Sequence, residues 1–177
     1  MTYSGDPAEN WLNPSNYLMM ASNIKKGLEE YINEKIETDV IDSNYEELKL
    51  NLSEIDAELK QIATNASNTT IVVSSDTFKY LEKYGFNVIS LEENNNLNEK
   101  TLSEVRKLLA NKKISYIFLK DDEKENDTIK KLKESYEFTT VKLNTISTLS
   151  ASDRKDKKDY ISIMEDNINS IKIEVNN

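Results

Sequence analysis

Hydrophobic positions recur at helical spacing through the first part of the chain. Asn13 and Pro14 open the pattern, because Asn is a favoured helix N-cap and Pro suits the first helical turn. The pattern predicts an amphipathic helix that ends near Lys35, followed by a polar connection at 37–43. Its apolar face is formed at steps of three and four residues by Tyr17, Met20, Ala21, Ile24, Leu28 and Tyr31.

A second, longer helix is predicted after this connection. Ser43 and Glu46 have the spacing of a capping box, with Ser at the cap and Glu three residues later. A narrow stripe follows, at steps typical of one helix packing along another: Tyr45, Leu48, Leu52, Ile55, Leu59 and Ile62. The helix either packs along the surface of its own domain, or is a spine that also contacts something outside that domain.

From residue 69 onward, short apolar runs alternate with amphipathic segments. The runs predict four strands at 69–75, 86–91, 114–119 and 138–143. Between and after the strands, the spacing of apolar residues predicts helices, the first of them capped by Ser75 or Asp76 and closed by Gly85. Strands separated by helices form parallel sheets. We therefore expect an α/β fold, a four-stranded parallel sheet flanked by helices, with an N-terminal turn and helix at 1–42, a spine helix at 43–67 and an α/β lobe at 68–177.

Composition narrows the function classes. The 177 residues include 31% charged side chains and carry a net charge of −9 without a long basic run, so we expect no nucleic-acid partner. The chain has no Cys and no His, which excludes thiolate ligands and histidine-based catalysis. No apolar run reaches the roughly 20 residues of a membrane span. No secretory signal opens the sequence, so a signal or lipid anchor of a longer parent would lie outside it.

The carboxyl ends of parallel strands are where such sheets bind ligands. Four groups of polar residues fall there: Ser74 to Asp76, Glu92 and Glu93, Lys120 to Asp122, and Asn144 with Thr145. Their oxygens suit hard cations, although loops at strand ends are polar in any protein. Residues 120–127 lack the glycine and the spacing of an EF-hand calcium loop, and are predicted to form a solvated turn with Asn126 or Asp127 capping the next helix.

Motifs of common enzymes are missing from the sequence. It contains no phosphate-binding glycine loop, nucleophile elbow or zinc-ligand spacing. Asp76 is the nearest candidate for a phospho-acceptor or an acid–base residue, but a helix cap is the commoner role for Asp at this position. We therefore expect no enzyme.

Four segments, in this order, resemble the solute-binding lipoproteins of zinc and manganese ABC transporters, some of which are also described as adhesins. They are DPAENWLNPSNYLMMASNI from Asp6, IVVSSDTFKYLEKYGF from Ile71, ISYIFL from Ile114 and DYISIMEDNI from Asp159. The resemblance covers the second half of the family pattern. It implies the C-terminal lobe of a two-lobed protein in which a long helix joins the lobes and the metal lies between them.

The resemblance also implies where metal ligands would stand, and each position is substituted. The family's first histidine falls on Glu9 counting back from Trp11, or on Ala8 counting forward from Asp6. Ser75 replaces a histidine or glutamate, and Asn144 lies where the family has its last acidic ligand. One carboxylate and two neutral oxygens hold zinc less tightly than a histidine-rich site. No cofactor is therefore certain, and we expect at most weak binding of Zn²⁺ or Mn²⁺.

Two functions follow from the resemblance. The chain is expected to be the C-terminal lobe of an extracytoplasmic metal-ion-binding protein, lipid-anchored in its parent, that delivers zinc or manganese to an ABC permease through a degenerate site. Alternatively, it is a surface adhesion or protein-interaction module that derives from this family and binds no metal. Either way, the stripe from Tyr45 to Ile62 is expected to expose apolar surface and to promote self-association through the spine helix.

Overall fold

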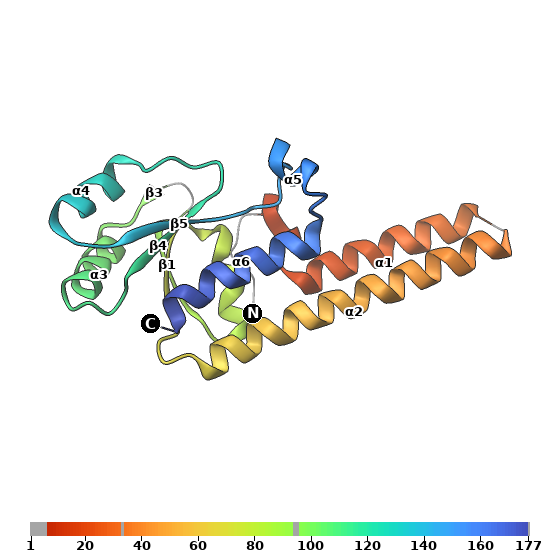
Figure 1. Cartoon of the computed structure of the whole chain (residues 1–177), viewed down its shortest axis with the longest axis horizontal. Helices are drawn as coiled ribbons and strands as arrows, with labels where there is room; N and C mark the ends of the chain where they lie inside the picture. Colours follow the sequence, from red (N-terminus) through yellow and green to blue (C-terminus); the bar gives the residue numbers. More distant parts are fainter. Residues whose placement is uncertain (1–6, 33, 94–95, 177) are drawn as a thin grey trace.

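A five-stranded sheet with helices on both faces forms the body of the molecule, and a helical hairpin projects from it (Figure 1). The computed structural model describes residues 7–32, 34–93 and 96–176. The elements in chain order are η1 (Pro7–Leu12), α1 (Pro14–Tyr31), α2 (Lys35–Asn65), β1 (Thr70–Ser75), η2 (Asp76–Tyr84), β2 (Asn87–Glu93), β3 (Asn96–Leu97), α3 (Glu99–Ala110), β4 (Tyr116–Lys120), α4 (Asp127–Ser135), β5 (Thr139–Leu143), α5 (Ala151–Lys155) and α6 (Tyr160–Val175).

The predicted four-stranded parallel sheet is confirmed. Its strand order is β3-β2-β1-β4-β5, and β1 pairs in parallel with both β2 and β4, as β4 does with β5. The two-residue strand β3 adds an antiparallel edge beside β2. It was not predicted, since two residues are too few to show a strand's alternating pattern.

Alternate residues of the strands face two separate cores. Ile71 and Val73 of β1 pack against η2, α2 and α6, and Val72 between them packs against α3 and α4. This follows from the two-residue period of a strand. Strands buried on both faces explain why the sequence showed continuous apolar runs rather than alternation.

Residues at the helix termini confirm most of the predicted boundaries. Asn13 accepts a hydrogen bond from the backbone N–H of Ser15 and caps α1, and Ser75 caps η2, which is a 3₁₀ rather than an α-helix. Gly85 ends η2 with a φ of 105°, a left-handed conformation that glycine adopts without strain. Asn126, rather than Asp127, caps α4, as one of the two predicted alternatives.

The predicted start of the long helix at Ser43 was wrong. The helix begins at Lys35, and both the proposed connection at 37–43 and the proposed capping box lie inside it. No Gly or Pro interrupts 35–43, and packing against α1 stabilises this stretch. Lys25 of α1 forms an ion pair of 2.5 Å with Asp42 and lies 5.0 Å from the ring centroid of Tyr45. The division into domains stays a prediction, with its first boundary now inside α2.

Within the described ranges, none of the helices is both long and apolar enough to cross a bilayer.

Candidate metal site at the carboxyl edge of the sheet

The carboxyl ends of β1, β2, β4 and β5 meet at one edge of the sheet, because these four strands run parallel. Two of the three positions expected to hold a metal, Ser75 and Asn144, lie at this edge, one at the end of β1 and the other just after β5. Glu9 lies in η1, and its side chain is outside the described part of the chain. The described part of the candidate site therefore consists of Ser75, Asn144 and the groups around them.

The hydroxyl of Ser75 is committed to the start of η2. It accepts a hydrogen bond of 3.4 Å from the backbone N–H of Thr77 and lies 3.1 Å from the hydroxyl of Thr77. These contacts cap the first turn of η2. A neutral hydroxyl engaged in this way is a poor ligand for zinc, which prefers thiolate, imidazole or carboxylate.

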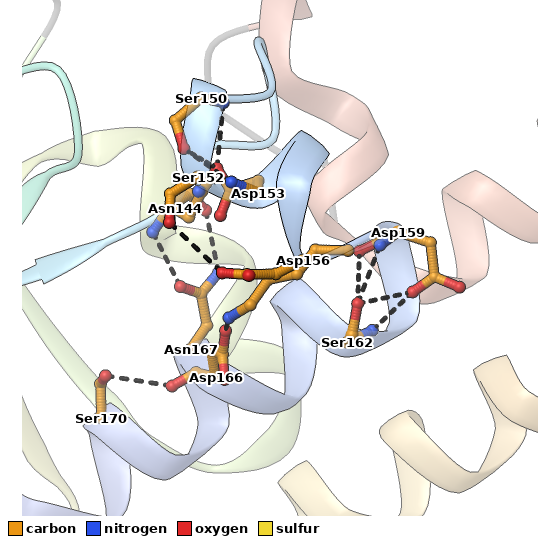
Figure 2. A network of polar contacts seen from close by, with 11 residues as sticks. Asn144, Ser150, Ser152, Asp153, Asp156, Asp159, Ser162, Asp166, Asn167 and Ser170 are labelled. Atoms are coloured by element: carbon orange, nitrogen blue, oxygen red, sulfur yellow. Dashed lines mark hydrogen bonds and ion pairs between the residues drawn. The ribbon is translucent and has the colours of Figure 1, made fainter.

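Asn144 is held by the backbone two residues along the chain and by α6. Its Oδ1 accepts a hydrogen bond of 2.7 Å from the N–H of Ile146. Asn167 binds the main chain of Asn144 from both sides, since its Oδ1 accepts from the N–H at 2.7 Å and its Nδ2 donates to the carbonyl oxygen at 2.8 Å (Figure 2). The Asn144 side chain therefore stabilises the loop after β5.

The same loop is tied to the N-terminal segment. The indole Nε1–H of Trp11 donates to the carbonyl oxygen of Thr145 at 2.8 Å, and the hydroxyl of Tyr160 donates to the carbonyl oxygen of Trp11 at 2.8 Å. The segment that contains Glu9 is thus fixed against the segment that contains Asn144. This brings together two of the three chain segments that the sequence singled out.

Two acidic side chains at this edge, Asp121 and Glu123, are engaged in hydrogen bonds within the protein. Asp121 accepts from both the N–H and the hydroxyl of Thr145, each at 3.0 Å. Glu123 accepts from the hydroxyl of Ser74 and from the N–H of Lys120. These carboxylates join the ends of β1, β4 and β5 to one another.

Glu92, at the end of β2, follows the same pattern and accepts from Asn126 at 3.2 Å. Across the described residues, no three His, Cys, Asp or Glu side chains converge to hold an ion. The edge therefore consists of interlocked loops, in which Asp121, Glu123 and Glu92 each already accept a hydrogen bond from a protein donor.

Two carboxylates near the loop after β5 are used as helix caps. Asp159 and Ser162 form a capping box at the start of α6, and the backbone and hydroxyl hydrogen bonds from Ser162 lower the pKa of Asp159 (Figure 2). Ser150 and Asp153 form a second capping box at α5, where hydrogen bonds from Ser150 lower the pKa of Asp153. Both carboxylates stay ionised at neutral pH, and their partners are those of helix N-termini.

The sequence had not identified Asn167 as part of this site. It is buried on the face of α6 that carries Met164, Ile168 and Ile171, where an apolar residue would be expected. A polar residue on a buried helix face needs hydrogen-bond partners, so its position was a usable signal. Its partners, the main-chain groups of Asn144, were not predictable from spacing.

Comparisons with known proteins relate the chain to metal transport. The chain matches the family model described as zinc-uptake complex component A, periplasmic (ZnuA), over residues 5–173. No curated protein sequence matches the chain. The family match spans nearly the whole sequence, as the four resembling segments did.

Solved structures share the fold. The metal-dependent lipoprotein YcdH from Bacillus subtilis is 19% identical with a TM-score of 0.75, over 94% of this chain and 63% of that one. The Zn(II)-bound ZnuA-like domain of Streptococcus pneumoniae AdcA is 20% identical with a TM-score of 0.71, over 100% of this chain and 70% of that one. The laminin-binding protein Lbp of Streptococcus pyogenes is 17% identical with a TM-score of 0.75, over 94% and 63%. The chain thus spans less than two thirds of YcdH and of Lbp.

Proposed function

Because the chain belongs to the zinc-uptake complex component A family, we propose that it is the C-terminal lobe of an extracytoplasmic metal-ion-binding protein whose own metal site has degenerated. In this proposal the parent protein is a lipid-anchored component of an ABC transporter for zinc or manganese, with a membrane permease as its partner. The chain is a binding component rather than an enzyme. Any Zn²⁺ or Mn²⁺ binds weakly, through Glu9, Ser75 and Asn144.

One observation carries the proposal. At the two expected ligand positions whose side chains are described, the residues are neutral, and their oxygens bind backbone N–H groups of the protein. Zinc would have to displace Thr77 from Ser75 and Ile146 from Asn144, and would gain two neutral oxygens in return. Neutral oxygens are weaker zinc ligands than imidazole or carboxylate, so this exchange disfavours tight binding.

The frame around the changed positions supports descent from a metal site. The hydrogen bonds from Trp11 to Thr145 and from Asn167 to Asn144 hold η1 and the loop after β5 together. In this proposal the hydrogen-bonded frame of η1 and the loop after β5 is retained, whereas the metal ligands are replaced.

Restoring the ligand residues tests whether the retained frame can still position a metal site. The triple variant Glu9→His, Ser75→His, Asn144→Asp supplies two imidazoles and one carboxylate, and we expect it to bind Zn²⁺ at least tenfold more tightly than the unchanged chain in a calorimetric titration. A matched control places the same residue types at exposed positions: Asn23→His, Gln61→His, Asn169→Asp. Equal affinities for the triple variant, the control and the unchanged chain would argue against a retained metal-site frame.

The alternative, a surface adhesion or protein-interaction module, is favoured by a different observation. The hairpin of α1 and α2 exposes large apolar side chains, among them Ile24 and Tyr31, which are 63% and 85% exposed. Exposed apolar patches mark interaction surfaces. Binding of the chain to a host matrix protein such as laminin, lost on Ile24→Glu but retained on Met19→Glu, would favour this function over metal delivery.

A further inference from the structure

The segment that follows β1 is wound unusually tightly for its length. η2 (Asp76–Tyr84) is a 3₁₀ helix of nine residues, whereas such helices rarely exceed three or four residues because their hydrogen bonds have poor geometry. The segment contains neither Gly nor Pro, and its Lys, Leu and Glu residues favour the α-helix. Local preference and observed winding therefore disagree along η2.

Burial against the body explains the tight winding. Phe78, Leu81 and Tyr84 are buried in the core that η2 shares with α2 and α6, and they recur at steps of three residues. A 3₁₀ helix has three residues per turn, so it places all three side chains on one face. An α-helix has 3.6 residues per turn and would rotate Tyr84 by about 120° relative to Phe78. The 3₁₀ form is thus held by packing rather than by the preference of its residues.

Hydrogen bonds hold both ends of η2. At its start, the hydroxyl of Ser75 accepts from the backbone N–H of Thr77. At its end, the ammonium group of Lys83 donates to Asp56 of α2 at 3.0 Å and to the hydroxyl of Ser15 of α1 at 2.6 Å. η2 therefore runs from a candidate metal position to the base of the hairpin of α1 and α2.

We propose that η2 is a conformational switch: loss of the Ser75 cap lets its first turns rewind toward the α form and loosens the contacts of Lys83. Rewinding all nine residues would shorten the helix by about 4–5 Å, because the rise falls from about 2.0 to about 1.5 Å per residue. A change of this length cannot be absorbed while both ends stay fixed. Rewinding at one end therefore strains the contacts at the other.

The trigger of the switch is the Ser75 hydroxyl. Any group that takes this oxygen displaces the N–H of Thr77, and a substitution that removes the oxygen has the same effect on the cap. The hairpin base, where Lys83 contacts α1 and α2, thereby responds to events at the carboxyl edge of the sheet. This inference goes beyond the proposed function, and it holds whether or not a metal ion is the group that takes the hydroxyl.

A double-mutant cycle between the two ends of η2 tests the proposal. Ser75→Ala removes the cap, and Lys83→Met removes the ammonium group but keeps an apolar stem. The two residues are about 16 Å apart along the helix, and residues at such a distance normally contribute additively to stability. In urea unfolding we expect instead that the change in the unfolding equilibrium constant of the double variant falls at least threefold short of the product of the two single changes. The reason is that the Lys83 contacts are already loosened once the cap is lost.

The neighbouring serine supplies a matched control. Ser74 lies one residue earlier in the chain, and its hydroxyl donates to Glu123 instead of capping η2. The cycle of Ser74→Ala with Lys83→Met is therefore expected to be additive. An additive cycle for Ser75 and Lys83, or a control cycle that is coupled as strongly, would overturn the proposal.

NMR of the folded chain gives a second readout. NOE contacts between residues four apart report α winding, and contacts between residues two apart report 3₁₀ winding. We expect the 3₁₀ pattern over 76–84 in the unchanged chain and in Ser74→Ala, and α contacts in the first turns of this segment in Ser75→Ala. Ser75 and Lys83 are both partly exposed, so their single variants should stay folded. An unchanged 3₁₀ pattern in Ser75→Ala would show that the cap does not control the winding and would equally overturn the proposal.

Discussion

The indole of Trp11 donates a hydrogen bond of 2.8 Å to the carbonyl oxygen of Thr145, which lies 134 residues further along the chain. This contact joins η1 to the loop after β5, the two segments in which the sequence placed Glu9 and Asn144. Two features that carry the resemblance in the opening segment, its tryptophan and its Asn-Pro helix start, thus have structural roles in this molecule. By the resemblance, the family's imidazole ligand falls on Glu9, or on Ala8 when counted forward from Asp6, and this placement stays a prediction.

Removing the indole donor should destabilise the protein. Trp11→Phe keeps an aromatic ring but leaves the carbonyl of Thr145 without this partner, and we expect the free energy of unfolding to fall by about 1–3 kcal/mol. Trp11 is the one tryptophan of the chain, so the variant has no tryptophan fluorescence to follow. Urea unfolding is therefore followed by circular dichroism. Tyr31→Phe, at a residue that is 85% exposed, should change the value by less than about 0.5 kcal/mol. Equal effects of the two substitutions would mean that the contact does not hold the loop.

The two hydrogen bonds between Asn167 of α6 and the main chain of Asn144 give a similar prediction. Asn167→Ala leaves the N–H and the carbonyl oxygen of Asn144 without their side-chain partners, and we expect a loss of about 2–4 kcal/mol in the free energy of unfolding. Asn169→Ala, two residues away on an exposed face of the same helix, is the control. Thermal unfolding measures the stability of both variants. A loss of stability for Asn167→Ala no larger than that for Asn169→Ala would contradict the stabilising role of Asn167.

The stripe of α2 should behave differently in its two halves. Leu59 is fully buried against the body, so Leu59→Ala is expected to cost about 2–5 kcal/mol in the free energy of unfolding through lost burial and a cavity. Leu48 lines an open groove between α1 and α2, and Leu48→Ala should cost clearly less. Chemical unfolding of both variants at the same low protein concentration makes the comparison. Equal costs would show that the hairpin of α1 and α2 is packed as tightly as the α/β body.

Glu174 gives a pH-dependent prediction. It is 2% exposed at the end of α6 and accepts hydrogen bonds from the N–H groups of Ser115 and Tyr116. Burial raises its pKa above the usual value, although the two N–H donors oppose this. A raised pKa in the folded state means that its stabilisation is present below the unfolded pKa and is lost as the pH rises through the folded value.

The variant Glu174→Gln should therefore change stability in a pH-dependent way. Relative to the unchanged chain, it should become progressively more stable as the pH rises from 4 through the range above the ordinary glutamate pKa of about 4.3. Free energies of unfolding of both proteins at each pH measure the difference, and other carboxylates cancel in the comparison. A difference that shrinks with rising pH would contradict the raised pKa of Glu174.

The sequence was sufficient for the sheet but not for the hairpin. The three inner parallel strands, β1, β2 and β4, are buried and appear as continuous apolar runs, so they could be predicted from local pattern alone. The start of α2 was missed because Ser43 and Glu46 mimic a capping box, whereas packing of 35–43 against α1 decides the boundary. Tertiary contacts override such local signals.

The location of the candidate site could be predicted from the sequence, but not all the contacts of its side chains. Strand ends and resemblance placed Ser75 and Asn144 at one edge of the sheet. The hydrogen bonds from Thr77 to Ser75 and from Ile146 to Asn144 are local, two residues along the chain, and Ser75 was predicted as a possible helix cap. The contacts of Asn167 with Asn144 join residues 23 positions apart, and spacing carries no information about such partners.

Titration of Zn²⁺ into the unchanged chain, followed by calorimetry, tests the central claim that the ligand positions have lost tight metal binding. We predict binding weaker than micromolar, which Glu9→Ala weakens further because Glu9 is the one carboxylate among the three positions. Submicromolar binding that Glu9→Ala or Ser75→Ala abolishes would contradict the account and establish a working metal site.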